Sequence, residues 1–174
     1  MPAILLLLVP AVVSAQQMEY SIKAEYLERF TRFIEWPADS PASDPKVPFR
    51  ICVIGKNPFG DYLRNMGEEV RIRGKHVDIL EIQNLQRISS CELLFIPASE
   101  KFRLQSILEQ TDGKAILTVS DSPGFAQMGV LINLYFSDSR IRFEINPDAV
   151  KRSGFRFSSL LMALGRLVGD EPRD

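Results

Sequence analysis

The chain has 174 residues, of which 45% are hydrophobic and 25% are charged, and this usage excludes a disordered, collagen-like or coiled-coil protein. The length predicts one compact domain with a substantial core. Lys and Arg together number 21 and Asp and Glu number 22, so the net charge of −1 argues against a broad nucleic-acid-binding surface.

The first 15 residues read as a secretory signal peptide. They carry no charged side chain, and residues 4–9 form an apolar run. The small residues at 13–15 match a signal-peptidase site, so the mature domain is predicted to span residues 16–174. The run lacks the positive start of most leaders, and it is too short for a membrane-spanning helix of about 20 residues. The alternative is a buried N-terminal helix.

The only two cysteines are Cys52 and Cys91. In an exported protein a lone pair of cysteines is expected to form a disulfide. A bond closing a loop of about 40 residues would stabilise the fold by roughly 4 kcal/mol in the chain-entropy model. Two buried thiols acting as small apolar side chains are the alternative.

An amphipathic helix is predicted from Tyr20 onward, because apolar residues recur at intervals of three and four. These residues are Tyr26, Leu27, Phe30, Phe33 and Ile34. The helix is expected to end near Trp36, since a residue before proline is pushed out of the helical region. Residues 37–48 contain Pro37, Pro41, Pro45 and Pro48 and are predicted to form an exposed loop.

The remaining sequence alternates between strand and helix patterns. Strands are predicted over residues 49–54, 91–96, 115–119, 130–136 and 140–145, and two short strands or a hairpin over 70–82. Helices are predicted over 58–66 with Pro58 in the first turn, over 100–110 capped by Ser99, and along 157–168. This order predicts an α/β fold, a single-domain sandwich in which helices flank both faces of a mixed central β-sheet.

No residue pattern indicates a catalytic or metal site. His76 is the only histidine and lies in a charged stretch, residues 71–76, which favours a solvated turn. A zinc site would depend on carboxylates, and a Ser-His-Asp arrangement lacks the G-x-S-x-G nucleophile turn. The carboxylate pairs, such as Asp112 with Asp121, are expected to be mostly solvated. Neither a metal nor another cofactor is expected.

The loop of residues 55–60 follows a strand and opens a helix, as a phosphate-binding loop does. The match fails at Asp61, because a phosphate loop requires Lys there. Its glycines are more simply explained by a tight turn that places Phe59 in the core. Trp36 is interpreted as a core residue, with an aromatic contact to a partner as the alternative.

Several blocks of the sequence together resemble the YfiR-like family of periplasmic proteins. The blocks, in order, are 23–30 with Phe33, Trp36 and Pro37; 51–55 with 58–60; Cys91 with 94–96; 117–121 with Phe125, Gly129 and Ile132; and 143–146 before 158–164. The resemblance covers residues 20–168. It marks Lys23, Trp36, Phe59, Phe125 and Asn146 as structural or partner-binding positions.

The resemblance implies an α/β sandwich that performs no chemistry. Members act in the periplasm as repressors that bind the periplasmic domain of an inner-membrane diguanylate cyclase and lower cyclic-di-GMP output. An outer-membrane lipoprotein can sequester the repressor. The best-known member has a second cysteine pair late in the chain, which this sequence lacks, so only Cys52 and Cys91 match.

The leading hypothesis is therefore an exported, non-enzymatic repressor of a diguanylate cyclase, with a homodimer left open. The alternative is a periplasmic small-ligand-binding domain that serves a sensor kinase or a transporter, because α/β folds bind ligands at the ends of their strands.

Overall fold

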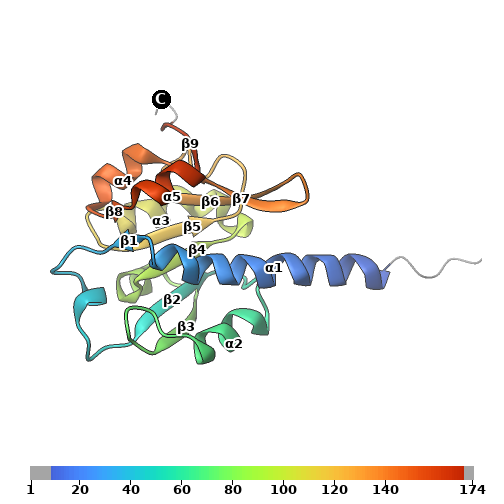
Figure 1. The fold of residues 1–174 in the computed structure, drawn as a ribbon, viewed down its shortest axis with the longest axis horizontal. Coiled ribbons are helices and arrows are strands. Elements are labelled where there is room, and N and C mark those ends of the chain that lie inside the picture. Colours follow the sequence, from blue (N-terminus) through green and yellow to red (C-terminus); the bar gives the residue numbers. More distant parts are fainter. Residues whose placement is uncertain (1–8, 171–174) are drawn as a thin grey trace, which may run out of the picture.

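A seven-stranded sheet forms the centre of the protein in the computed structural model, which describes residues 9–170 (Figure 1). Its strands, in sheet order, are β3 (Val77–Ile82), β2 (Phe49–Ile54), β4 (Leu93–Ile96), β5 (Leu117–Ser120), β6 (Ile132–Ser137), β7 (Arg140–Ile145) and β9 (Arg166–Leu167). The strands from β3 to β6 run parallel, and β7 is antiparallel to β6. The predicted mixed sheet is confirmed.

The central strands are apolar on both faces, and each face belongs to a separate core. In β4, Leu93 and Phe95 join one hydrophobic cluster, whereas Leu94 and Ile96 join the other. Neighbouring β2 divides its side chains in the same alternating way. Strands covered on both sides read as continuous apolar runs, which explains the pattern of residues 91–96.

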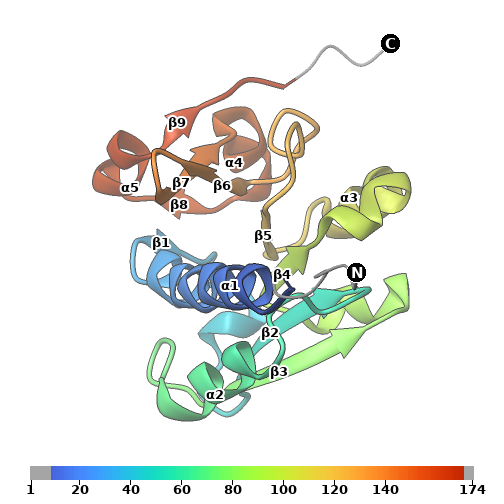
Figure 2. The same cartoon turned by 90° about the vertical axis from the view of Figure 1, so that its right-hand side faces the viewer.

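Helices cover both faces of the sheet, as the sequence predicts. One face is packed by α1 (Val9–Thr31), α2 (Asp61–Glu69) and α5 (Ser159–Leu164), and α3 (Leu104–Thr111) lies on the other (Figure 2). The α4 helix (Pro147–Ser153) adds Ala149 and Val150 to the first cluster. Three short 3-10 helices complete the fold: η1 (Pro41–Ser43), η2 (Leu85–Ser90) and η3 (Ala98–Arg103).

The first predicted helix ends earlier than expected, at Thr31 rather than near Trp36. Its last turn is closed by a bond from the Phe33 N–H to the Phe30 carbonyl. The next residues form β1 (Ile34–Glu35), which pairs antiparallel with β8 (Arg156–Phe157). Pairing with this distant strand holds Ile34 and Glu35 in an extended conformation, so the helix ends before the chain reaches Pro37.

The prediction that residues 37–48 form an exposed loop is wrong for its centre. Ser40 and Ala42 are buried. The Lys75 ammonium donates to the carbonyls of Pro41 and Ala42, at 3.1 and 3.0 Å, and holds η1 against the domain. Burial lowers the pKa of this lysine.

Three other boundaries differ from prediction. Pro58 precedes α2, because Gly60 with φ +56° occupies the N-cap. Ser99 lies inside η3 and caps nothing, since Pro97 is the N-cap there. The predicted helix over residues 157–168 is divided, because β8 pairs with β1 and β9 pairs with β7 on either side of α5.

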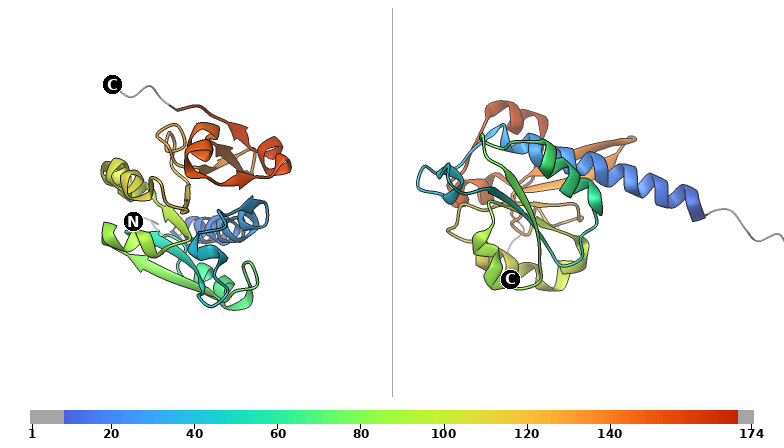
Figure 3. Two further views of the ribbon diagram at one scale, coloured as in Figure 1. Left: turned by 90° about the vertical axis from the view of Figure 1, so that its left-hand side faces the viewer. Right: turned by 90° about the horizontal axis from the view of Figure 1, so that it is seen from below.

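The N-terminal part of α1 projects beyond the sheet (Figure 3). Residues 9–15 of the predicted signal peptide form its first turns, and residues 1–8 of that peptide lie outside the described residues. The cleavage near Ala15 stays a prediction. None of the helices within residues 9–170 combines the length and the apolar character that crossing a bilayer requires.

Candidate functional site

Cys52 and Cys91 form the predicted disulfide, with their Cα atoms 5.9 Å apart. Cys52 lies in β2, and Cys91 lies just before β4, the strand next to it in the sheet. Both residues are buried in the cluster on the α3 side of the sheet. The bond therefore ties two central strands together inside the core.

Lys23 is held at the carboxyl ends of the parallel strands. Its ammonium lies 2.7 Å from Asp121 Oδ2 and 2.6 Å from Glu19 Oε1, and the side chains of Lys23 and Asp121 are each only 5% exposed. The Tyr20 hydroxyl donates to the same carboxylate oxygen at 2.9 Å. Burial first, and then the charge of Asp121, raise the pKa of Tyr20. The cluster fastens α1 to the end of β5.

Phe59 lies in the core, as predicted, in edge contact with Phe95 at 4.6 Å between ring centroids. Its ring also meets Tyr20 at 5.4 Å. The loop of residues 55–60 is thus a tight turn that carries an apolar anchor. Tyr20 links this anchor to the Lys23 cluster.

Trp36 is buried at the other end of α1. Its indole ring makes edge contacts with Phe49 at 5.4 Å and with Phe155 at 5.2 Å. The Arg73 guanidinium lies 5.8 Å from the centre of the ring. These contacts join the start of β2 to the segment after α4, so Trp36 has the core role that the sequence favoured.

Asn146 organises the start of α4. Its Oδ1 accepts from the Ala149 N–H at 2.9 Å, and its Nδ2 donates to the Ala126 carbonyl and to Asp170 Oδ1, both at 2.7 Å. Phe125, next to Ala126, fills the cluster on the α3 side of the sheet. One buried amide therefore joins the loop after β5, the end of β7 and the C-terminal segment.

The five family positions do not converge on one site. All of them are buried, and each supports a different junction of the fold. Lys23 and Phe59 share a neighbour in Tyr20, and Phe125 and Asn146 share one in the 125–126 segment. These five residues therefore stabilise the fold beneath the surface, and they do not themselves form a surface site.

Sequence reasoning missed a second polar network inside the sheet. Asn133 accepts from the Ser120 hydroxyl and donates to Glu144 at 3.2 Å, and Glu144 also binds Arg166. The side chain of Asp121, expected among the solvated carboxylates, is likewise only 5% exposed. The sequence signal for these buried polar side chains was that Ser120 and Asp121 lie directly where an apolar strand ends.

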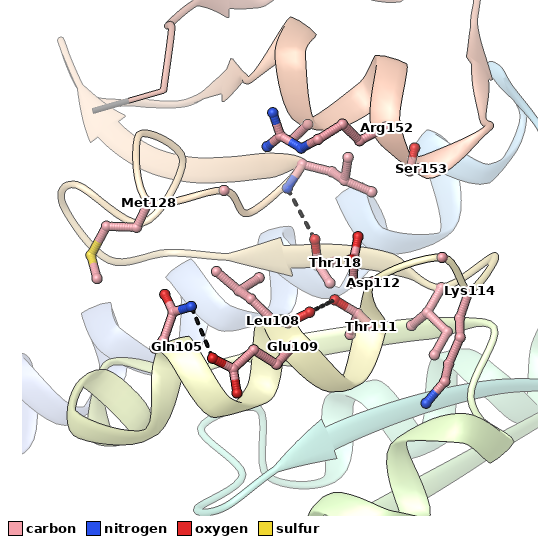
Figure 4. Close-up of a pocket in the computed structure, with 15 residues that line it drawn as sticks. Gln105, Leu108, Glu109, Thr111, Asp112, Lys114, Thr118, Met128, Arg152 and Ser153 are labelled. Atoms are coloured by element: carbon pink, nitrogen blue, oxygen red, sulfur yellow. Dashed lines mark hydrogen bonds between the residues drawn. The ribbon is translucent and has the colours of Figure 1, made fainter. Parts of the chain in front are cut away.

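A cavity of about 180 Å³ opens between α3, β5 and α4 (Figure 4). Leu108 lines it from α3, Thr118 from β5 and Arg152 from α4. The Thr118 hydroxyl accepts from the Leu131 N–H at 3.0 Å, and the Gln105 amide donates to Glu109 at 3.1 Å. Charges of both signs surround the cavity, which suits a small zwitterionic molecule.

His76 is exposed directly before β3, as the solvated-turn interpretation expects. Within residues 9–170, no three His, Cys, Asp or Glu side chains are grouped so that they could hold a metal ion.

The sequence matches the YfiR/HmsC-like family over residues 20–166. The chain belongs to this family. The match spans α1 from Tyr20 through α5, and so includes the disulfide and all five family positions. The YfiR/HmsC-like family is one of periplasmic regulators of diguanylate cyclases.

Two solved structures share the fold. One is an ABC domain from Streptococcus pneumoniae in complex with L-Trp, and it aligns with a TM-score of 0.55 and 8% identity over 86% of this chain. The other is a conserved domain protein from Vibrio cholerae O1 biovar eltor, with a TM-score of 0.55 and 8% identity over 87% of this chain. The chain spans 60% of the length of each. At this identity the likeness concerns the fold alone.

Proposed function

We propose that this protein is exported to the periplasm and represses an inner-membrane diguanylate cyclase by binding its periplasmic domain. The observation that carries the proposal is the family match over residues 20–166. The predicted signal peptide gives the chain a route to the compartment where that domain lies. In this role the protein acts by contact, without turnover of a substrate.

Repression by contact places a thermodynamic demand on the interface. The protein lowers cyclase output only if it binds the inactive arrangement of the sensor domain more tightly than the active one. To move an equilibrium from 1:99 to 99:1, the two affinities must differ by about 10⁴-fold. An outer-membrane lipoprotein that sequesters the protein would relieve repression by removing the free form.

The test is a gene deletion combined with measurement of cyclic-di-GMP. Deletion is expected to raise the cyclic-di-GMP level, and a second deletion of the cyclase gene is expected to abolish the rise. A tagged copy recovered from solubilised membranes is expected to carry the cyclase with it. An unchanged cyclic-di-GMP level in a strain with an intact cyclase would refute the proposal.

A second candidate function is the binding of a small molecule in the cavity of Figure 4. It is favoured by the mixed charges of that cavity and by the L-Trp held by the ABC domain of similar fold. In a thermal-shift assay, an amino acid present at 100 times its dissociation constant stabilises a protein by about 2.7 kcal/mol. L-tryptophan is the first probe, and Arg152→Ala is the variant expected to lose the shift.

A further inference from the structure

The strand β3 forms a long free edge of the central sheet (Figure 2). In the described part of the chain it pairs with β2 alone, in an unbroken parallel register from Val77 to Ile82. The opposite edge of the sheet is β9, which has only two residues. A short edge strand offers little backbone for further pairing, whereas a long one presents a row of unpaired N–H and carbonyl groups.

The ladder between β2 and β3 determines which backbone groups of β3 point away from the sheet. The Phe49 N–H donates to the His76 carbonyl at 2.7 Å, and the Gly55 N–H donates to the Ile82 carbonyl at 2.9 Å. In a regular parallel ladder, alternate residues of a strand bond to the same neighbour. The inward residues, whose backbone groups bond to β2, are therefore Asp78, Leu80 and Ile82. The outward residues are Val77, Ile79 and Glu81.

The β3 edge lacks the features that most strongly prevent pairing with a further strand. Natural edges are commonly blocked by a proline, a β-bulge or a charged side chain, lysine above all. The sequence of β3 contains neither proline nor lysine, and its register with β2 contains no bulge. Val77, Ile79 and Leu80 are half-buried, so a strand added beside β3 would cover the apolar surface that they still expose.

The charges of β3 indicate what kind of strand can pair with it. Its only charged residues are Asp78 and Glu81, which are both exposed. Neither carboxylate forms an ion pair within residues 9–170. The basic residues nearby, at 71–76, precede the paired register. Opposite charges on neighbouring strands stabilise the pair and like charges destabilise it, so the edge favours a basic strand over an acidic one.

We propose that β3 binds an extended basic segment of another protein as an added strand of the sheet. The N–H and carbonyl groups of the outward residues bond to the backbone of this segment, and its lysine or arginine side chains lie beside Asp78 and Glu81. Backbone bonds of this kind supply affinity, and the side chains select the sequence. The proposal goes beyond the proposed function, because purified protein binds such a segment whether or not it represses a cyclase.

Amide hydrogen exchange followed by NMR tests the pairing directly on the purified wild-type protein. In the free protein the amides of the inward residues are expected to exchange slowly, and those of the outward residues are expected to exchange fast. The probe is the peptide acetyl-Lys-Val-Lys-Val-Lys-Val-Lys-Val-amide. At ten times its dissociation constant, the peptide is expected to slow the outward amides about tenfold, because only about one protein molecule in eleven stays free.

Two further peptides separate backbone pairing from attraction between charges. A peptide of the same sequence with every backbone nitrogen methylated keeps its lysines but cannot donate a backbone hydrogen bond, and it is expected not to slow the outward amides. The peptide in which glutamate replaces each lysine keeps its backbone donors, and it is expected not to bind because it meets Asp78 and Glu81.

Glu81→Pro and Glu81→Gln form a matched pair of variants. Both lack the carboxylate, but only proline removes the outward N–H of this residue. Glu81→Pro is therefore expected to bind the lysine peptide about tenfold more weakly than Glu81→Gln, the equivalent of one hydrogen bond. The N–H of residue 81 takes no part in the ladder with β2, so both variants are expected to keep the circular dichroism spectrum of wild type.

Outward amides that do not slow when the lysine peptide is added overturn the proposal. Equal binding of the methylated and unmethylated peptides overturns it as well, since charge alone would then explain the contact. The same holds for equal binding by the two Glu81 variants, and for outward amides that slow as the protein concentration rises, because two copies would then pair with each other. The exchange measurement on wild type needs no variant, so it decides the question even where the proline variant does not fold.

Discussion

Lys23 and Asp121 lie 98 residues apart in the sequence and form a buried ion pair, with 2.7 Å between Nζ and Oδ2. The pair joins α1 to the carboxyl end of the central strand β5. The rings of Tyr20 and Phe59 also meet at this end of the sheet. The buried pair therefore helps to hold α1 at the end of β5, together with the apolar side chains of α1 that pack in the core.

Replacing Lys23 by Met is expected to destabilise the fold by about 3 kcal/mol, because Asp121 keeps a buried charge without its cation. Urea unfolding of the oxidised protein measures this loss. In the double variant Lys23→Met with Asp121→Leu, no lone charge remains, so the loss is expected to be smaller than the sum of the single losses.

Arg29→Met is the control for this cycle. Arg29 pairs with Glu25, but both side chains are 59% exposed, so the loss is expected to stay below about 1 kcal/mol. Equal losses for Lys23→Met and Arg29→Met would show that the buried pair does not fasten α1.

The disulfide is expected to resist thiol chemistry in the folded protein. Cys52 and Cys91 are both buried, so a maleimide should label neither before reduction, and labelling after reduction should need denaturant to be complete. The double variant Cys52→Ala with Cys91→Ala is expected to lose about 2–4 kcal/mol of unfolding free energy. Rapid labelling of two thiols in native periplasmic extract would contradict the bond.

The parts of the fold that could be predicted from sequence are those set by local patterns. The run at 91–96 predicts a strand covered on both faces because nearly every side chain in it is apolar, and β4 has that position. The end of α1 could not be predicted, since it depends on the pairing of Ile34 with Phe157. The burial of the Asp121 side chain could not be predicted either, because it depends on the ion pair with Lys23, which is distant in the sequence.

Gly55 is a position where the backbone and the packing both require glycine. Its φ is +77°, and a Cβ there would collide with the carboxylate of Glu100. Gly55→Ala is therefore expected to destabilise the protein by about 2–4 kcal/mol, combining backbone strain with the displacement of a buried side chain. Thermal unfolding followed by circular dichroism measures the change.

Gly74→Ala provides the comparison, because Gly74 has the same φ of +77° as Gly55 but faces open space. Its expected cost is about 1 kcal/mol, from the backbone alone. If the two alanine variants melt together, then Glu100 does not restrict Gly55.

Glu92 is expected to make stability depend on pH. Burial raises the pKa of this carboxyl above its ordinary value of 4.5, and the Arg50 N–H, which donates at 2.7 Å, only partly offsets the burial. The charges of Arg50 and Lys75 oppose the rise as well. The folded protein thus binds the proton more tightly than the unfolded chain, so ionisation of Glu92 favours unfolding.

The stability that the neutral carboxyl contributes is fully present below pH 4.5 and is lost as the pH rises through the raised pKa. In Glu92→Gln the side-chain carbonyl can still accept from the Arg50 N–H, and the titrating group is removed. Urea unfolding at a series of pH values is therefore expected to show similar stabilities for wild type and variant in acid. Above the raised pKa, the variant is expected to be the more stable of the two. Two curves that stay parallel across this range would mean that Glu92 titrates alike in the folded and unfolded chains.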